Sequence, residues 1–186
     1  MSTKPVIVYG ASGYTGRLIC EFLRQYNVPF TAAGRNAATL TDSMTSHVPG
    51  IETADYEVVE VEHSVEALTE LFSGSSVVLN TVGPFMKLGD PVVQAALAVG
   101  AHYTDTTGEQ DWLLHCDETY GTQFAAAGLL IAPGIAQMYT TGEIAAQIAL
   151  ETPGLDTLDI AVFWGGSPTI ASTRTILVNA AGGAAY

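Results

Sequence analysis

Residues 6–19 read VIVYGASGYTGRLI, an apolar run followed by three glycines at intervals of three residues and then by a helical pattern. Four consecutive apolar residues at 6–9 predict a strand that is buried on both faces. From Leu18 to Tyr26, apolar residues recur at helical spacing and polar residues occupy the opposite side. This stretch therefore predicts a strand, a tight turn and a helix in direct succession.

Each glycine has its own place in such a connection. Gly10 can adopt the backbone angles of a sharp turn, Gly13 lets a phosphate approach the main chain, and Gly16 lets the helix lie close to the strand. The free N–H groups and the dipole of the helix then favour an anion. An ordinary strand-to-helix turn can carry the same spacing, but the buried-type strand and the amphipathic helix favour a dinucleotide site. We therefore expect a pyrophosphate to be bound by Gly10, Ala11, Ser12, Gly13, Tyr14, Thr15 and Gly16.

The composition is that of a globular chain with few charges. Of 186 residues, 48% are hydrophobic and 13% are charged, which predicts a large core without a tail or linker. Six Lys and Arg stand against 19 Asp and Glu, and the resulting net charge of −13 repels nucleic acids and anionic lipid surfaces. We therefore expect no nucleic-acid partner, and any arginine beside a phosphate site becomes conspicuous.

The cysteines and the N-terminal residues bear on the compartment. Cys20 and Cys116 fall in separate predicted helices, which favours two buried thiols over a disulfide and indicates a reducing compartment. The first five residues are too short and polar for a secretory signal, and no apolar run approaches membrane-spanning length. We predict a cytoplasmic protein without a membrane span. No metal site is expected, because the histidines lie in different elements without ligand spacing: His47, His63, His102 and His115.

A second short strand, predicted at residues 30–33, ends at Gly34-Arg35-Asn36. In a dinucleotide fold, an acidic residue at this tip binds the ribose hydroxyls of NAD, whereas an arginine pairs with the 2′-phosphate of NADP. The tip carries Arg35 and no acid, so we favour NADP over NAD and count Arg35 and Asn36 as cofactor residues. The alternative is a solvated arginine that only starts the next helix.

Strands and helices alternate through most of the chain. Further strands are predicted at 56–61, 77–80, 101–105 and 129–132. Helices are predicted at 37–44, 65–72, from 89 or 90 to 100, around 112–124, and from 140 or 141 to 149. Right-handed crossovers between such elements give an α/β fold with a doubly wound, mostly parallel sheet covered on both faces.

The apolar strand that begins at Val77 breaks at a polar pair, Asn80-Thr81, and a Gly-Pro follows. In a doubly wound sheet the fourth strand lies beside the first, and ligands bind outside the carboxyl ends of the strands at this switch point. We therefore expect Asn80, Thr81, Val82 and Gly83 near the nicotinamide ribose or the diphosphate. The alternative is that Asn80 caps a turn and that Gly83-Pro84 only directs the chain.

Two acidic residues follow the fifth strand at the same edge. One interpretation places Asp105 and Glu109, with Tyr103, at the mouth of the cofactor cleft, where they could contact substrate. The other, which the pattern favours, is that the two carboxylates cap the helix that contains Trp112. No catalytic residue is predicted.

The pattern changes from Leu155 onward. Leu158, Ile160, Val162 and Trp164 alternate with other residues in a longer predicted strand, and a weak helical run ends at 180–183. We interpret residues 1–152 as a dinucleotide-binding domain and residues 153–186 as the start of a second, α+β domain for substrate binding or dimerisation.

Four motifs in this order resemble the saccharopine dehydrogenase-like oxidoreductases: GASGYTGR at 10–17, AGRN at 33–36, NTVGPF at 80–85 and HYTDTTGE at 102–109. The chain also carries GDPVV at 89–93, and it looks most similar to the branch that includes the trans-acting enoyl reductases. The resemblance covers most of residues 5–134. It implies a Rossmann domain that binds NAD(P) and takes part in hydride transfer.

The chain departs from this family in two respects. Where family members usually continue after Pro-Gly with Asp-Ser and Pro-Ser-Asp, residues 135–141 read IAQMYTT, so no role of those side chains is carried over. Family members are also longer, with a substrate domain and a return to the Rossmann sheet. We therefore expect this chain to correspond to their N-terminal portion.

The leading interpretation is an NADP-dependent oxidoreductase, or its cofactor-binding domain, that transfers hydride to or from an unidentified small or acyl substrate. A non-catalytic NADP-binding sensor or scaffold is the alternative. An acyl-phosphate reductase would need a nucleophilic cysteine in a loop, and a short-chain dehydrogenase would need a Tyr-x-x-x-Lys pair; the chain provides neither. The expected partners are a nicotinamide dinucleotide and a small-molecule substrate, and a homodimer stays open.

Overall fold

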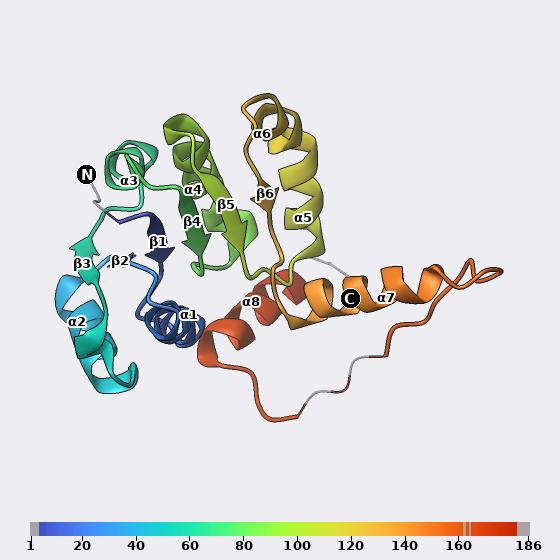
Figure 1. The fold of residues 1–186 in the computed structure, drawn as a ribbon, viewed down its shortest axis with the longest axis horizontal. Coiled ribbons are helices and arrows are strands. Elements are labelled where there is room, and N and C mark those ends of the chain that lie inside the picture. Colours follow the sequence, from blue (N-terminus) through green and yellow to red (C-terminus); the bar gives the residue numbers. More distant parts are fainter. Residues whose placement is uncertain (1–3, 162, 164, 182–186) are drawn as a thin grey trace.

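Six parallel strands form one sheet in the order β3-β2-β1-β4-β5-β6, with helices on both of its faces (Figure 1). The computed structural model describes residues 4–161, 163 and 165–181. The strands are β1 (Val6–Tyr9), β2 (Phe30–Gly34), β3 (Tyr56–Glu60), β4 (Val77–Asn80), β5 (His102–Asp105) and β6 (Ile131–Ala132). The strand order reverses between β1 and β4, so the predicted doubly wound, Rossmann-type sheet and its switch point are confirmed.

The helices follow the strands in alternation. They are α1 (Tyr14–Gln25), α2 (Ala37–His47), α3 (Val65–Phe72), α4 (Phe85–Val99), α5 (Gln110–Cys116), α6 (Thr122–Ala126), α7 (Gly142–Leu150) and α8 (Ile170–Ala181). Three short helical segments complete the described part: η1 (Ile51–Thr53), η2 (Asp117–Gly121) and η3 (Gln137–Thr141). Within the described residues, no helix is long and apolar enough to cross a bilayer.

Successive residues of β1 pack into two separate hydrophobic cores, one on each face of the sheet. Ile7 and Tyr9 pack with α3, α4 and α5 on one face of the sheet, whereas Val8 packs with α1 and α2 on the other. All three side chains are almost completely buried. Alternate side chains of a strand point to opposite faces, so a central strand with helices on both sides has to be apolar throughout. The apolar run at 6–9 is the sequence of such a central strand.

The register brings the carboxyl ends of the strands to one edge. Tyr9 at the end of β1 is level with Ala33 in β2 and with Asn80 in β4, and Asn80 is level with Asp105 in β5. The turns that follow these strands therefore lie side by side. In Figure 1, α7 and α8 cross below this edge.

Helix α4 begins earlier than predicted. The sequence placed its start at Gly89 or Asp90, but the helix begins at Phe85 and includes Pro91. The carboxylate of Glu109 accepts hydrogen bonds from the backbone N–H groups of Phe85 and Met86, and so supplies the cap from a residue that is distant in the chain. No local pattern carries this information.

The C-terminal part differs from the prediction in one element. The described residues of the expected strand, 158–161 and 163, form no strand, and Val162 and Trp164 lie outside the described residues. The side chains there are exposed, and the backbone there joins none of the six described strands. An alternating pattern forms a strand only when its backbone pairs with a neighbouring strand. The helical run is present as α8, whereas the division into two domains stays a prediction.

Candidate functional site

The turn between β1 and α1 is built on two close backbone approaches. Gly10 has a φ of +90°, and a Cβ atom there would lie 2.6 Å from the Thr81 hydroxyl oxygen. A Cβ atom on Gly16 would lie 2.5 Å from the Gly10 carbonyl oxygen and 2.7 Å from the Cα of Ala11. Only glycine fits either position, and the turn and helix approach have the form expected of a phosphate-binding connection.

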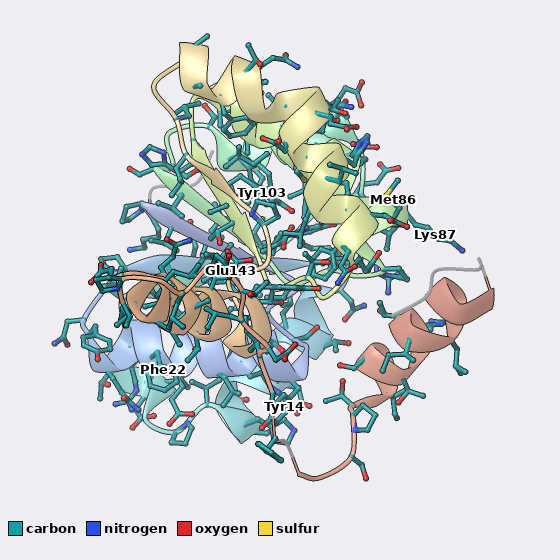
Figure 2. All side chains as sticks on the ribbon, turned by 90° about the vertical axis from the view of Figure 1, so that its right-hand side faces the viewer. Tyr14, Phe22, Met86, Lys87, Tyr103 and Glu143 are labelled. Carbon is teal, nitrogen blue, oxygen red and sulfur yellow. The ribbon has the colours of Figure 1, made fainter. Side chains whose placement is uncertain are left out.

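The first turn of α1 has open backbone donors. Gly13 is the N-cap, no described side chain caps the helix, and the first turn contains no acidic residue. The first N–H groups of a helix have no partner within it, so those of Tyr14, Thr15 and Gly16 are available to an anion. Figure 2 shows Tyr14 and Phe22 on α1, and both side chains are more than half exposed.

The start of α2 is different, because two of its backbone donors are occupied. The Asn36 side chain accepts from the Thr39 N–H at 2.8 Å, and the Glu60 carboxylate accepts from the Ala37 N–H at 2.8 Å. Arg35, immediately before this cap, is exposed and forms no ion pair with any residue in the described ranges. At this tip the Arg35 guanidinium is therefore the charged donor that an anion would meet.

The glycine turn and the Arg35 tip are joined directly. The N–H groups of Gly10 and Ala11 both donate to the carbonyl oxygen of Ala33, at 2.9 and 3.2 Å. Ala33 is two residues before Arg35. The glycine turn before α1 and the segment that leads to Arg35 are thus held together by backbone hydrogen bonds at the edge of the sheet.

A pair that the sequence did not predict lies beside Arg35. The Tyr9 hydroxyl and His63 Nδ1 are hydrogen bonded at 2.8 Å, and the two rings are stacked 6.0 Å apart. Burial, and then the positive charge of Arg35, lower the pKa of His63, so the imidazole is neutral at neutral pH. The only signal in the sequence was the position of His63, three residues after the end of β3.

The loop after β4 contacts the glycine turn. The Thr81 hydroxyl donates to the carbonyl oxygens of Tyr9 and Gly10, at 3.0 and 3.1 Å. Asn80 is fully buried, and its Oδ1 accepts from the Val82 N–H at 2.9 Å, as in the turn-capping interpretation. Gly83 is exposed and faces α8, where the Thr175 hydroxyl oxygen would lie 3.6 Å from a Cβ at Gly83.

Tyr103, Asp105 and Glu109 lie at this edge but inside the protein. Tyr103 and Asp105 are at most 1% exposed and Glu109 is 3% exposed. Figure 2 marks Tyr103 amid packed side chains, whereas Met86 and Lys87, labelled farther to the right at the start of α4, are exposed. Contact of Tyr103, Asp105 and Glu109 with substrate stays a prediction. The predicted cap on the helix of Trp112 is wrong, because no described side chain caps α5 and Glu109 caps α4 instead.

Both cysteines are buried free thiols, as predicted. Burial raises the pKa of Cys20 to about 12. Burial, and then the negative charges of Asp105 and Asp90, raise the pKa of Cys116 further above its usual range. Neither thiol is therefore a nucleophile at neutral pH.

Residues 6–129 match the family model described as saccharopine dehydrogenase NADP binding domain, and residues 140–186 match a family of unknown function, DUF5938. The chain is 33% identical over 138 residues to a lipid droplet localized protein of Caenorhabditis elegans, which covers 70% of this chain and 32% of that protein. It is 30% identical over 129 residues to a trans-acting enoyl reductase of Mycobacterium leprae, and this alignment covers 68% of this chain and 30% of that protein. The chain thus spans about a third of the length of these relatives.

Solved structures share the fold. Saccharopine dehydrogenase (L-Glu forming) of Saccharomyces cerevisiae has a TM-score of 0.63 at 15% identity, over 80% of this chain and 31% of that chain. The quinone oxidoreductase QOR2 of Escherichia coli, complexed with NADPH, has a TM-score of 0.50 at 18% identity. The match covers 69% of this chain and 47% of that chain. The family match confirms the resemblance drawn from the four motifs: the chain belongs to the saccharopine dehydrogenase NADP-binding domain family.

Proposed function

We propose that this chain binds NADP(H) in preference to NAD(H) and is the cofactor-binding part of an oxidoreductase. The observation that carries the proposal is the contrast between two neighbouring helix starts. Helix α1 keeps its backbone donors open behind a glycine turn, whereas α2 is capped and has beside it an arginine that pairs with no acid in the described ranges. The first arrangement suits a pyrophosphate, and the second suits a 2′-phosphate.

The pyrophosphate would lie on residues 10–16. The backbone there offers N–H donors, and the absence of a Cβ at Gly13 leaves room for phosphate oxygens to approach the main chain. The dipole of α1 adds a favourable field for the negative charge. These features fit the dinucleotide without any side-chain cation.

Arg35 would hold the 2′-phosphate. A guanidinium can donate two parallel hydrogen bonds to a phosphate, which neither an asparagine nor a backbone amide reproduces. In a chain with a net charge of −13, this arginine offsets the repulsion that the rest of the surface exerts on the ligand. Asn36 would support it by fixing the start of α2.

The nicotinamide half would lie along residues 80–83. The bound cofactor supplies the hydride chemistry, and the protein supplies orientation. Thr81 ties this loop to the glycine turn, so the two halves of the dinucleotide would rest on surfaces that are rigidly connected. The substrate is not identified, and a trans-acting enoyl reductase among the relatives supports an acyl substrate for the whole protein.

A non-catalytic NADP-binding module is the second candidate. It is favoured by the burial of Tyr103, Asp105 and Glu109, because these side chains already have partners inside the protein. Turnover of NADPH with enoyl, imine or keto compounds would separate the two candidates.

The location is also a proposal: we expect a cytoplasmic protein, although one relative is named for lipid droplets and another as a probable mitochondrial oxidoreductase.

The proposal is tested by titrating the wild-type chain and Arg35→Ala with NADPH and NADH by calorimetry. We expect the substitution to weaken NADPH binding about ten- to a hundredfold, as the loss of charge-assisted hydrogen bonds would, and to leave NADH within about twofold. Arg174→Ala is the matched control, because it removes an exposed arginine from α8. Equal weakening of both nucleotides by Arg35→Ala would remove the case for a 2′-phosphate site.

A further inference from the structure

A series of buried hydrogen bonds runs from α5 to the loop after β4. Trp112 Nε1 donates to Asp105 Oδ2 at 2.7 Å, and the Tyr103 hydroxyl donates to the same oxygen at 2.8 Å. Asn80 Nδ2 then donates to the Tyr103 oxygen at 3.1 Å. All four side chains are at most 1% exposed, so water cannot replace a lost partner.

Asp105 sets the direction of every bond in this series. Its other oxygen accepts from the backbone N–H groups of Thr107 and Gly134, at 3.0 and 2.9 Å, so four donors surround one carboxylate. Because the carboxylate only accepts, the Tyr103 hydroxyl has to donate to it. The phenol oxygen then presents its lone pair to Asn80, and the Asn80 amide has to present its NH₂ group.

The orientation of the Asn80 amide decides what the loop can do. With Nδ2 facing Tyr103, Oδ1 faces the Val82 N–H and accepts from it at 2.9 Å. A flipped amide would place an NH₂ group against that N–H and leave both without an acceptor. The distant carboxylate therefore fixes the backbone of residues 80–82 through two intervening side chains.

Glu109 holds the other end of the same loop. Its carboxylate accepts from the N–H groups of Phe85 and Met86, at 2.7 and 3.0 Å. The segment 81–84 is thus held between two buried carboxylates, while Gly83 itself is exposed. A loop that is fixed at both ends and open in the middle is a rigid surface for a ligand.

We propose that Tyr103 and Asp105 are positioning residues that hold residues 80–83 in the shape that receives the nicotinamide half of the dinucleotide. This inference rests on the proposed function, because it assumes that a nicotinamide dinucleotide binds at this edge. It assigns the two residues a role through Asn80 and not through contact with substrate.

The experiment compares two ligands on the full chain. NADPH carries both halves, whereas adenosine 2′,5′-bisphosphate carries the adenosine and the 2′-phosphate without nicotinamide. Tyr103→Phe removes the two hydrogen bonds that the hydroxyl makes with Asp105 and Asn80. We expect it to weaken NADPH binding by roughly three- to tenfold, because the loop loses its fixed shape, and to leave the bisphosphate within about twofold. The change in NADPH fluorescence on binding, which reports the surroundings of the nicotinamide, should shrink as well.

Tyr120→Phe is the matched control. It removes a hydroxyl from another buried tyrosine, one that donates to Asp90 and not to the loop, and we expect it to change neither affinity by more than about twofold. If Tyr103→Phe does not fold, hydrogen exchange of residues 81–83 in the wild type replaces it. Exchange there should slow with NADPH and stay unchanged with the bisphosphate.

Three outcomes would overturn the inference: Tyr103→Phe weakens both ligands equally, it weakens neither, or the wild type binds both ligands with equal affinity and unchanged NADPH fluorescence. In the exchange experiment, equal slowing by both ligands or by neither would do the same. The proposed function fails separately, if the wild type binds neither ligand.

Discussion

Gly10 and Thr81 are so close that a Cβ on the glycine would lie 2.6 Å from the threonine hydroxyl oxygen. The threonine cannot turn away without loss, because the same hydroxyl donates to the carbonyl oxygens of Tyr9 and Gly10. This contact joins the first strand to the fourth at the switch point of the sheet. It holds together the two loops that we propose to bind the cofactor.

Gly10→Ala should therefore destabilise the protein by more than the cost of placing a non-glycine residue at a positive φ. A non-glycine residue at positive φ costs roughly 1–2 kcal/mol, and the clash with Thr81 adds to this. Gly100→Ala is the control, because Gly100 has a φ of +75° and a Cβ added there would have no atom of the described residues within 4 Å. Urea unfolding should give a larger loss for Gly10→Ala, and equal losses would contradict the contact.

Gly16→Ala sets two effects against each other. Replacing glycine by alanine within a helix stabilises it by roughly 0.5–1 kcal/mol. Here the new Cβ would lie 2.5 Å from the Gly10 carbonyl oxygen, a backbone atom that cannot rotate away. We expect the cost of the clash to exceed the helical gain, so that the free energy of unfolding measured in urea falls by about 1–3 kcal/mol. NADPH binding should weaken as well. A stabilised variant would show that α1 is not packed against the turn.

Glu109→Gln should destabilise the start of α4. The carboxylate accepts from two backbone N–H groups, whereas a glutamine can offer only one oxygen and turns its NH₂ group toward the second donor. The expected cost is about 1–3 kcal/mol in chemical unfolding. Glu118→Gln, at an exposed glutamate, should cost less than about 0.5 kcal/mol. Similar costs for the two variants would argue against the cap.

The protein should lose stability at alkaline pH. Burial raises the pKa of Cys20 to about 12 and raises that of Tyr103 well above its usual range. A raised pKa in the folded state means that the unfolded chain releases its protons first, so the free energy of unfolding falls once the pH exceeds about 9. Urea midpoints should stay nearly constant up to about pH 9 and then decrease toward about pH 11; a midpoint that is constant to about pH 11 would mean that these groups are not buried.

The same burial predicts unreactive thiols. With a pKa of about 12, Cys20 at pH 8 is thiolate in only about one molecule in ten thousand. A disulfide reagent should therefore label neither cysteine in the native chain and both in urea. Rapid labelling of one thiol in the native protein would show that its surroundings open to solvent.

Local patterns predicted most of the fold, and their failures have a common cause. The strand at 6–9 and helix α1 were found because burial on two faces and helical spacing are written in consecutive residues. The start of α4 was missed because its cap, Glu109, comes from a different strand-to-helix loop. The expected strand at 158–164 failed in its described residues because alternation gives a strand only beside a partner.

The candidate site shows the same limit. The glycine turn and the position of Arg35 follow from the sequence, since each depends on where one strand ends. The pairing of Tyr9 with His63 and the burial of Asp105 depend on which strands are neighbours and in what register. Those facts arise only when the sheet is assembled, so the sequence could suggest the residues but not their contacts.

We propose above all that the edge of the sheet binds a nicotinamide dinucleotide and selects it by its 2′-phosphate. Calorimetry of the folded wild-type chain with NADPH and NADH in parallel tests it most directly. We predict one binding site and an affinity for NADPH at least about tenfold higher than for NADH, as one charge-assisted contact would give. If neither nucleotide binds at millimolar concentration, or if NADH binds more tightly, the account is contradicted.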